Sequence, residues 1–421
     1  MIKRLKGGIL YYSLLVIILS SSVAGLILLS SYFENRILMG AMHQEALERD
    51  TRSALNLYLV GEDFFRLSDT ASTTLYANNS NRVLLSKKRW GLYTIISVSS
   101  HWKNKSDFLL GLTGSDIFSA EPVALYMQDD GRVLSLSGNT ILKGTCYLPG
   151  KTARPSAIEG QQYNYKDLVF GTIKQSAKTL PALDSELLES PLRYLNEGTS
   201  DTDSIIRVEA LDSQSLGNSF SSRTIIIKTD SIGDLNGYSL KGNVIIWATG
   251  KLIIEKTTNL EDVILLAPKI LVKSGFTGTF QAFALQSISL EKDCDLKFPS
   301  QLCVVQSEAQ YDPGDSLIIS IESGTKLSGG VIIKSAGLTS FIKIAEETTL
   351  YGQVYCPGIV EIHGNIIGSV YCKTFYIKTL RARYYNHLLN ARIDFPDLSR
   401  HFVGVDLLKT IKEKKLIKWL D

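Results

Sequence analysis

The stretch GQVYCPGIVEIHGNIIGSVYCKTFYIK, residues Gly352–Lys378, contains one unit written twice. Four residues of the first copy recur sixteen positions later in the second, as Gly352/Gly368, Val354/Val370, Tyr355/Tyr371 and Cys356/Cys372. Apolar residues alternate with other residues behind each glycine, which is typical of strands joined by corners and not of helices. A strand unit repeating at about this period predicts a parallel β-solenoid, in which successive turns of the chain stack on one another.

The same glycine-led pattern occurs elsewhere in the chain, since Gly144–Gly150 (GTCYLPG) parallels Gly352–Gly358 (GQVYCPG). Aligning such runs on their glycines predicts one column of inward pairs, namely Cys146/Leu148, Val244/Ile246, Phe280/Ala282, Val331/Ile333, Val354/Cys356 and Val370/Cys372. On this alignment three tyrosines face outward, Tyr147, Tyr355 and Tyr371. Corners need residues that tolerate positive φ, and we expect them at Gly144, Gly242, Gly278, Gly352 and Gly368.

The limits of the coil follow from where this pattern is present and absent. We predict a first turn over residues 133–150, an insertion over 151–223 and the main solenoid over 224–397. One turn buries too few apolar side chains to offset its loss of backbone entropy, so turns hold only as a stack with capped ends. The basic, amphipathic segment 398–421 is expected to be a capping helix, with contact to lipid or a partner helix as the alternative.

The amino-terminal segment Gly7–Phe33 carries no charged side chain. Its apolar part, Ile9–Leu29, would be about 31 Å long as a helix, close to the hydrocarbon thickness of about 30 Å. Its Leu, Ile and Val residues favour insertion by about −4 to −8 kcal/mol. These features predict a transmembrane anchor over 7–33 with the lipid bilayer as its partner, and lipid contacts at Ile9, Leu14, Ile18, Leu26 and Leu29.

A cleaved signal peptide is the competing interpretation, because Ser22–Ala24 resembles a small-residue cleavage site. The apolar run resumes at Leu26–Leu29, which favours an uncleaved anchor. Lys3, Arg4 and Lys6 lie before the span, and this local density of positive charge places residues 1–6 in the cytoplasm. The sequence thus predicts a single-pass protein of the inner (cytoplasmic) membrane with most of the chain periplasmic or otherwise extracytoplasmic.

After the span, residues 34–60 keep a helical pattern, with apolar positions at Leu47, Ala54, Leu55 and Tyr58. Anchor and amphipathic stalk are therefore expected to form one helix of about fifty residues. This layout resembles the long first helix of type IV pilins and pseudopilins. The resemblance implies an accessory subunit of a secretion or pilus machine. However, Ser13 occupies the position of the glutamate in the pilin motif if Gly8 marks the processing site, which favours an ordinary stalk helix and leaves the pilin-like subunit as the alternative.

Residues 61–132 are predicted to form a small α/β domain with an antiparallel sheet that packs on the stalk. The expected strands are Arg82–Ser86, Trp90–Val98 and Phe108–Leu112. The polar segment His101–Asp107 is expected to be the loop between the last two strands.

The sequence contains no recognised catalytic or metal-binding motif. Its five cysteines include no C-x-x-C pair, and its five histidines are scattered. The carboxylate pairs Asp293/Asp295 and Asp312/Asp315 lie beside Pro, Gly or Lys, where acidic residues commonly form turns. We therefore predict no catalytic residue, cofactor or metal, with a carbohydrate-active β-helix enzyme as the alternative. Stacked Cys356 and Cys372 could form a disulfide or remain buried thiols. The net charge of +3 gives no indication of nucleic-acid binding.

The glycine-led turns over residues 237–379 resemble the repeats of bactofilins, the polymer-forming β-helical proteins of bacteria. Taken together, the patterns predict a mainly β chain with one N-terminal transmembrane and stalk helix, a small antiparallel sheet domain and a parallel β-solenoid. The expected function is that of a non-catalytic envelope protein whose solenoid serves as a scaffold or as a surface for protein partners or self-association.

Overall fold

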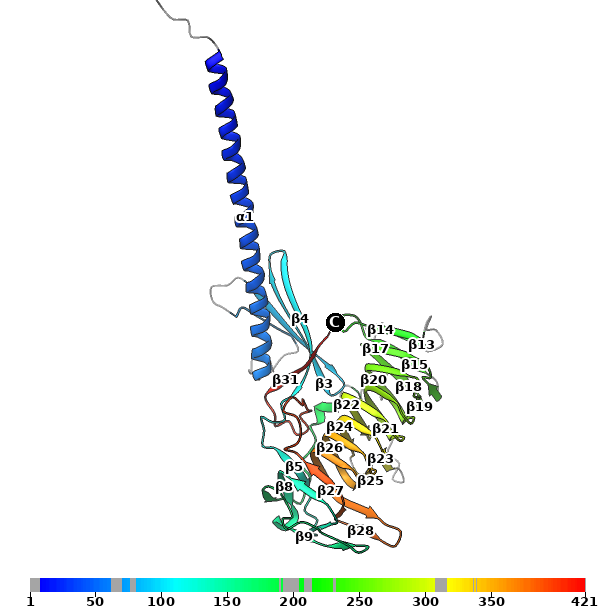
Figure 1. Ribbon diagram of the computed structural model, residues 1–421. Coiled ribbons are helices and arrows are strands. Elements are labelled where there is room, and N and C mark those ends of the chain that lie inside the picture. Colours follow the sequence, from blue (N-terminus) through cyan, green and yellow to red (C-terminus); the bar gives the residue numbers. More distant parts are fainter. Residues whose placement is uncertain are drawn as a thin grey trace, which may run out of the picture. The chain divides into compact units, whose positions relative to one another are not determined.

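The computed structural model describes residues 8–61, 70–75, 81–188, 191, 204–207, 214–229, 232–306, 316–335, 337 and 339–420. The prediction of a mainly β chain with one N-terminal helix is confirmed (Figure 1). The chain divides into two compact units, one of residues 1–58, 62–86 and 97–109, the other of residues 59–61, 87–96 and 110–421. The predicted charged cluster at residues 1–6 and the pair Asp312/Asp315 lie outside the described residues.

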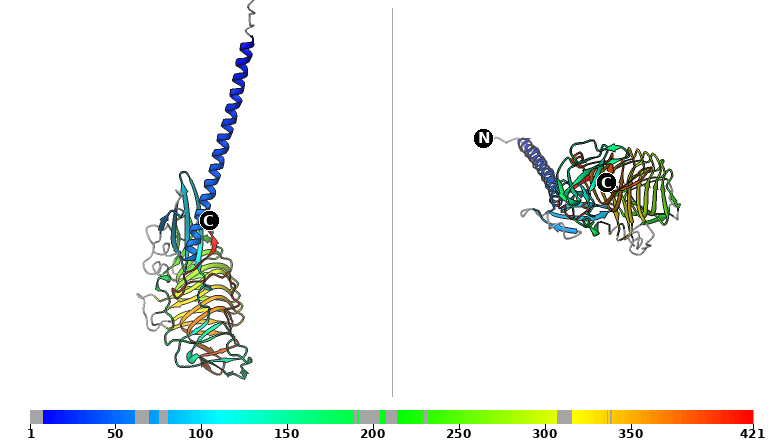
Figure 2. Two further views of the ribbon diagram at one scale, coloured as in Figure 1. Left: turned by 90° about the vertical axis from the view of Figure 1, so that its left-hand side faces the viewer. Right: turned by 90° about the horizontal axis from the view of Figure 1, so that it is seen from below.

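Helix α1, Gly8–Val60, is one continuous helix of 53 residues (Figure 2). Every residue from Gly8 to Met39 is exposed, and burial begins only in the second half. The buried residues are Leu47, Asp50, Thr51, Ala54, Leu55 and Tyr58. They include all four apolar positions that the helical spacing identified, so this stripe packs within the first unit as expected for an amphipathic stalk.

A five-stranded antiparallel sheet has the order β1-β2-β3-β4-β31. Its strands are β1 (Thr70–Thr73), β2 (Arg82–Trp90), β3 (Tyr93–Trp102), β4 (Lys105–Ser115) and β31 (Lys414–Trp419). The predicted strand Trp90–Val98 is correct from Tyr93 onward, where it lies in β3, but Gly91, at φ +59°, turns the chain, so Trp90 ends β2 instead. The predicted loop His101–Asp107 is reduced to a tight turn at Lys103, whose φ is +52°. Within the first unit, the Thr51 and Ser100 hydroxyls hydrogen-bond at 2.8 Å, which joins α1 to β3.

The second unit contains one large sheet of parallel strands whose pairings close on themselves. Its strands before residue 230 are β5 (Val123–Met127), β7 (Ile141–Lys143), β8 (Thr145–Leu148), β12 (Ile173–Gln175), β13 (Ser204–Arg207), β14 (Ser215–Asn218) and β15 (Ile225–Thr229). Those up to residue 290 are β16 (Ile232–Asp234), β17 (Ser239–Gly242), β18 (Val244–Ala248), β19 (Lys251–Ile254), β20 (Asn259–Val272) and β21 (Thr277–Leu290). The others are β22 (Asp295–Val305), β23 (Ser316–Ile321), β24 (Lys326–Lys334), β25 (Thr339–Ile344), β26 (Thr349–Ile362), β27 (Asn365–Lys378) and β30 (Arg392–Asp394).

Smaller elements complete this unit. Strands β6 (Leu134–Ser137), β9 (Ala153–Pro155) and β29 (His387–Leu389) form a three-stranded sheet. Strands β10 (Ala157–Ile158) and β11 (Gln161–Gln162) pair with each other, and β28 (Arg383–Tyr385) pairs antiparallel with the end of β27. Two short 3₁₀ helices cover Pro149–Lys151 and Ser185–Leu188.

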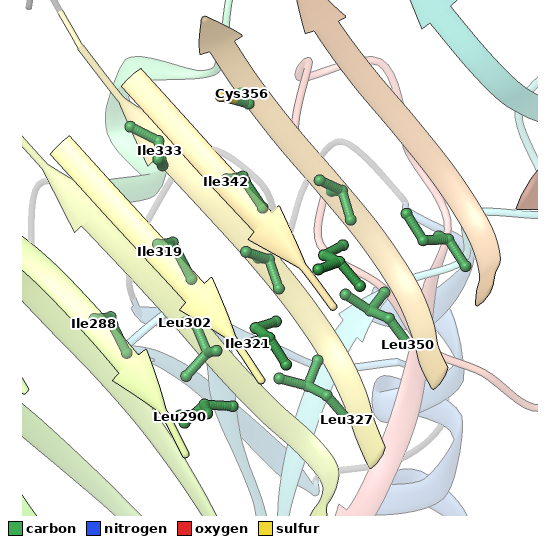
Figure 3. Packing of buried hydrophobic residues seen from close by; sticks show 14 of the residues in the cluster. Ile288, Leu290, Leu302, Ile319, Ile321, Leu327, Ile333, Ile342, Leu350 and Cys356 are labelled. Carbon is green, nitrogen blue, oxygen red and sulfur yellow. The ribbon is translucent and has the colours of Figure 1, made fainter. Parts of the chain in front are cut away.

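The two copies of the unit repeated in residues 352–378 are aligned residue for residue in β26 and β27. The paired positions are Gly352/Gly368, Val354/Val370, Tyr355/Tyr371 and Cys356/Cys372. From Val354 the column of paired residues continues through Val331, Leu302, Ala282, Leu265 and Ile246. These side chains and those of the neighbouring strands fill one continuous aliphatic core, part of which Figure 3 shows.

The glycine alignment places two of the runs out of register by two residues. Ile246 and Ala282, and not Val244 and Phe280, occupy the column of Val354. For the run at Phe280, the error comes from treating Gly278 as a corner, whereas Gly242, before Val244, does have a positive φ of +83°. Gly278 is paired with Leu296, in a column of leucines, and the ring of Phe276 fills the space where its side chain would lie. Because a shift of two keeps the same side of a strand facing inward, the predicted inward residues are nevertheless buried.

The order of the stack also differs from the order of the chain. The run Gly144–Gly150 contains β8, which pairs with β5, and β5 pairs with β27 near the other end of the sequence. Strands β12, β13 and β14 lie inside the predicted insertion 151–223 but belong to the parallel sheet. The predicted helix at 398–421 is wrong, because β31 extends the antiparallel sheet by pairing with β4. The backbone N–H and C=O groups of β31 thereby pair with those at the edge of β4.

Candidate interaction surface

The predicted anchor residues all lie on the exposed half of α1. Ile9, Leu14, Ile18, Leu26 and Leu29 are each more than half exposed. Among the described residues, α1 is the one helix that is long and apolar enough to cross a membrane. A run of exposed aliphatic side chains is unfavourable in water and favourable in the hydrocarbon of a bilayer.

The eight predicted solenoid-core residues are all 0% exposed, namely Val244, Ile246, Val331, Ile333, Val354, Cys356, Val370 and Cys372. They lie inside the parallel sheet, where they support the surface without forming it. Cys356 and Cys372 are paired in register, and both are free thiols. Burial raises the pKa of Cys356 to about 12 and that of Cys372 well above its usual value, so neither thiol is readily ionised.

Of the acidic residues considered for catalysis, the described pair is Asp293 and Asp295. Asp293 is exposed in a turn at φ +58°, and Asp295 begins β22, half-buried. Of the histidines, His363 contacts Glu361 at 2.9 Å. Within the described ranges, no three His, Cys, Asp or Glu side chains are placed so that they could hold a metal ion.

One outer face of the parallel sheet is covered by other segments of the same unit. Three glutamines lie in one outward column, Gln281, Gln301 and Gln353. The Gln281 amide accepts a hydrogen bond from Leu92 N at 2.8 Å and donates one to Trp90 O at 3.0 Å. The Gln353 amide makes the same pair of bonds with the backbone of Val405, at 2.8 and 3.1 Å. Each glutamine amide thus bonds a backbone N–H and a backbone C=O, as a neighbouring strand would. The segments at Trp90–Leu92 and Val405 therefore cover this face, and a partner cannot reach these glutamines.

The adjoining outward column carries a row of four tyrosines in register, Tyr355, Tyr371, Tyr126 and Tyr147. Successive ring centroids are 6.3, 6.1 and 5.2 Å apart, and the ring planes differ by 15–33°. Three of these tyrosines were predicted to face outward. Tyr126 was missed because VALYM, residues 123–127, has no leading glycine and was assigned to the antiparallel domain.

No family model, curated protein or solved structure matches this chain. The contacts and distances of the tyrosine row are therefore the evidence for what it does. At one end of the row, Lys174 and Glu121 form an ion pair, and the Tyr147 hydroxyl donates to Glu121 Oε2 at 3.2 Å. The hydrogen bond from Lys174 lowers the pKa of Glu121, and the same bond raises the pKa of Lys174.

The hydroxyl groups of the row hold a segment of chain that follows β12. Ala177 N donates to the Tyr126 hydroxyl at 3.0 Å, and the Tyr355 hydroxyl donates to Pro181 O at 2.8 Å. Tyr126, Tyr147 and Tyr371 remain half-buried, so parts of their rings are accessible. A row of stacked aromatic rings that ends in an ion pair can stack against a ligand or a partner.

Proposed function

We propose that this chain is a membrane-anchored, non-catalytic protein in which a parallel β-solenoid provides a scaffold or an interaction surface. The observation that carries the proposal is the column of parallel-paired residues that runs from Ile246 to Val370 beside one continuous hydrophobic core. A stack of this kind is rigid along its length, because each turn is held by hydrogen bonds to its neighbours. The resemblance to bactofilin repeats supports only the coiled arrangement of the strands, and polymerisation is not part of the proposal.

The second part of the proposal is that α1 spans the inner membrane once, with its amino terminus in the cytoplasm and the sheets outside. It is supported by the exposed surface of Gly8–Phe33, which carries no charged side chain. The experiment is extraction of membranes with alkaline carbonate, which removes peripheral proteins. We expect the unaltered chain to stay with the membrane and the double variant Leu14→Arg/Ile18→Arg to be released, because a central Arg costs about 2.5–3.5 kcal/mol of insertion free energy.

The matched control is Leu38→Arg/Met42→Arg, which alters two exposed apolar residues of α1 beyond the predicted span. It should remain with the membrane. Release of the unaltered chain, or equal behaviour of both double variants, would exclude the anchor. Protease added to intact spheroplasts tests the orientation. Digestion of the sheets is expected, and digestion only after lysis would place them in the cytoplasm.

A pilin-like accessory subunit is a second candidate, favoured by the packing of the second half of one long helix against an antiparallel sheet. Because Ser13 stands where the pilin motif has glutamate, this candidate requires processing next to Gly8 without that residue. Mass spectrometry of the mature amino terminus distinguishes the two. A terminus beginning at Ile9, directly after Gly8, would support the pilin-like subunit, and an intact one would support the simple anchor.

A further inference from the structure

The hairpin formed by the end of β27 and by β28 combines an exposed apolar tip with unneutralised positive charge. Its turn is fixed by Thr379, whose side-chain oxygen accepts hydrogen bonds from Arg381 N at 3.3 Å and Ala382 N at 3.1 Å. Thr379 N also donates to Ala382 O at 2.9 Å. This ordered turn leaves Leu380 fully exposed, at 103%. A single exposed apolar side chain is common on protein surfaces, so Leu380 gains significance only from the charged and aromatic side chains that lie beside it on the same hairpin.

The strands of the hairpin place like charges opposite each other. Lys378 and Arg383 are directly paired across the two strands, and Arg381 lies in the turn between them. All three are exposed, and none makes an ion pair within the described part of the chain. Like charges in a cross-strand pair are destabilising. The cost would be removed by an anionic surface that neutralises them.

The local sequence contains no acidic residue that could do so. Between Glu361 and Asp394 the chain has no Asp or Glu. Glu361 itself is 8% exposed and bound to His363. On the same face as the paired cations, Tyr376 and Tyr385 pack with ring centroids 5.4 Å apart, and Tyr385 is 47% exposed.

We propose that the β27–β28 hairpin binds the surface of an anionic lipid bilayer. Leu380 would enter the boundary between headgroups and acyl chains, the exposed tyrosine would lie at the level of the headgroups, and the three cations would contact the anionic headgroups. Apolar, aromatic and basic side chains in this combination are those that bind the membrane interface. A purely ionic partner would neutralise the cations but would leave Leu380 exposed. The inference rests on residues 361–394 alone and is independent of the function of α1.

The test uses the full chain in nanodiscs of phosphatidylcholine and measures its binding to vesicles with and without phosphatidylglycerol by co-flotation. We expect binding only to the anionic vesicles. Each cation near such a surface is worth roughly a fivefold change in binding, so Lys378→Gln/Arg381→Gln/Arg383→Gln should weaken it about a hundredfold. Leu380→Ser should weaken it by roughly tenfold through loss of apolar burial.

The matched control is Lys251→Gln/Lys297→Gln/Lys326→Gln, which removes three exposed lysines elsewhere on the parallel sheet and changes the net charge equally. It should bind as the unaltered chain does. Equal weakening by both triple variants would reduce the effect to net charge and would overturn the proposal. Equal binding to neutral vesicles, or binding to a soluble polyanion such as polyglutamate but not to anionic vesicles, would overturn it as well. Because Leu380 is fully exposed, Leu380→Ser folds without loss of packing and keeps the test decisive.

Discussion

Three glycines stacked on neighbouring strands provide the sharpest test of the parallel register. Gly329, Gly352 and Gly368 are paired in succession, at φ +153°, +143° and +150°. A Cβ at Gly368 would lie 1.8 Å from the carbonyl oxygen of Gly352, and one at Gly352 would lie 1.7 Å from that of Gly329. Because a backbone oxygen held in a sheet cannot move as a flexible side chain can, Gly368→Ala forces the two strands apart.

The expected cost has two parts. A non-glycine residue in a sparsely populated backbone region costs about 1–3 kcal/mol. Inserting a methyl group where there is no space adds about 1–3 kcal/mol. Gly368→Ala should therefore lower the free energy of unfolding by about 2–6 kcal/mol. The measurement is chemical denaturation of the full chain in detergent, monitored by the β-sheet signal in circular dichroism.

Two matched variants separate these parts. Gly217, in β14, has ordinary backbone angles and no atom within 4 Å of its Cβ position, so Gly217→Ala should change stability by no more than about 0.5 kcal/mol. Gly131, at φ +80°, also has free space, so Gly131→Ala reports backbone strain alone, at about 1–3 kcal/mol. If Gly368→Ala cost no more than Gly131→Ala, the close contact between β26 and β27 would be wrong, and with it the register.

Three further predictions concern buried polar groups. Burial by itself raises the pKa of Asp394, but hydrogen bonds, first from Arg392 at 2.7 Å, outweigh burial and lower it. Asp394 therefore stabilises the fold above its unfolded pKa of about 3.9, and this stability is lost as the pH falls through the lower folded value. Asp394→Asn should lower the free energy of unfolding by about 1–3 kcal/mol at neutral pH. In a plot of this free energy against pH, the variant should lose less stability on acidification than the unaltered chain, and an equal loss would contradict this role. Burial raises the pKa of Cys356 to about 12, so maleimide should label it only after denaturation, and labelling of the native chain would refute its burial. Tyr93→Phe removes the acceptor that Gln301 Nε2 contacts at 2.6 Å, and denaturation should show a loss of about 1–3 kcal/mol, against no change for Tyr165→Phe at a more exposed site.

The parallel repeat could be predicted because its period is written into the chain. A column position is set by alternation, so Val354, Val370 and their neighbours could be assigned to the interior from spacing alone. The register could not be fixed in the same way, since glycine has different uses. Gly352 makes a corner at φ +143°, whereas Gly278 makes room for the ring of Phe276. Nothing in a local window separates these two uses.

The surface was harder to predict than the core. Tyr126 and Lys174 complete the tyrosine row, but they come from segments that local pattern assigned to another domain and to an insertion. Their position depends on the pairing of β5 with β27, which joins residues more than two hundred positions apart. Such a long-range pairing depends on which strand edge is free in the folded chain. The sequence of either strand alone does not indicate its partner. The hairpin cations likewise resemble an ordinary solvated turn until their cross-strand pairing is known.

The pairing of β5 with β27 also explains how the proposed solenoid limits its own self-association. A coil ending at β27 would present a long strand of fourteen residues as an open edge. Strand β5 covers part of that edge, then β8 and finally β12, which has only three residues and carries Lys174. At the other end, β13 has four residues, ends in Arg207 and pairs at one edge within the described chain. Short edge strands with a charged residue are poor templates for further pairing. The ends of the proposed solenoid are therefore poor templates for further copies of the chain unless they are remodelled.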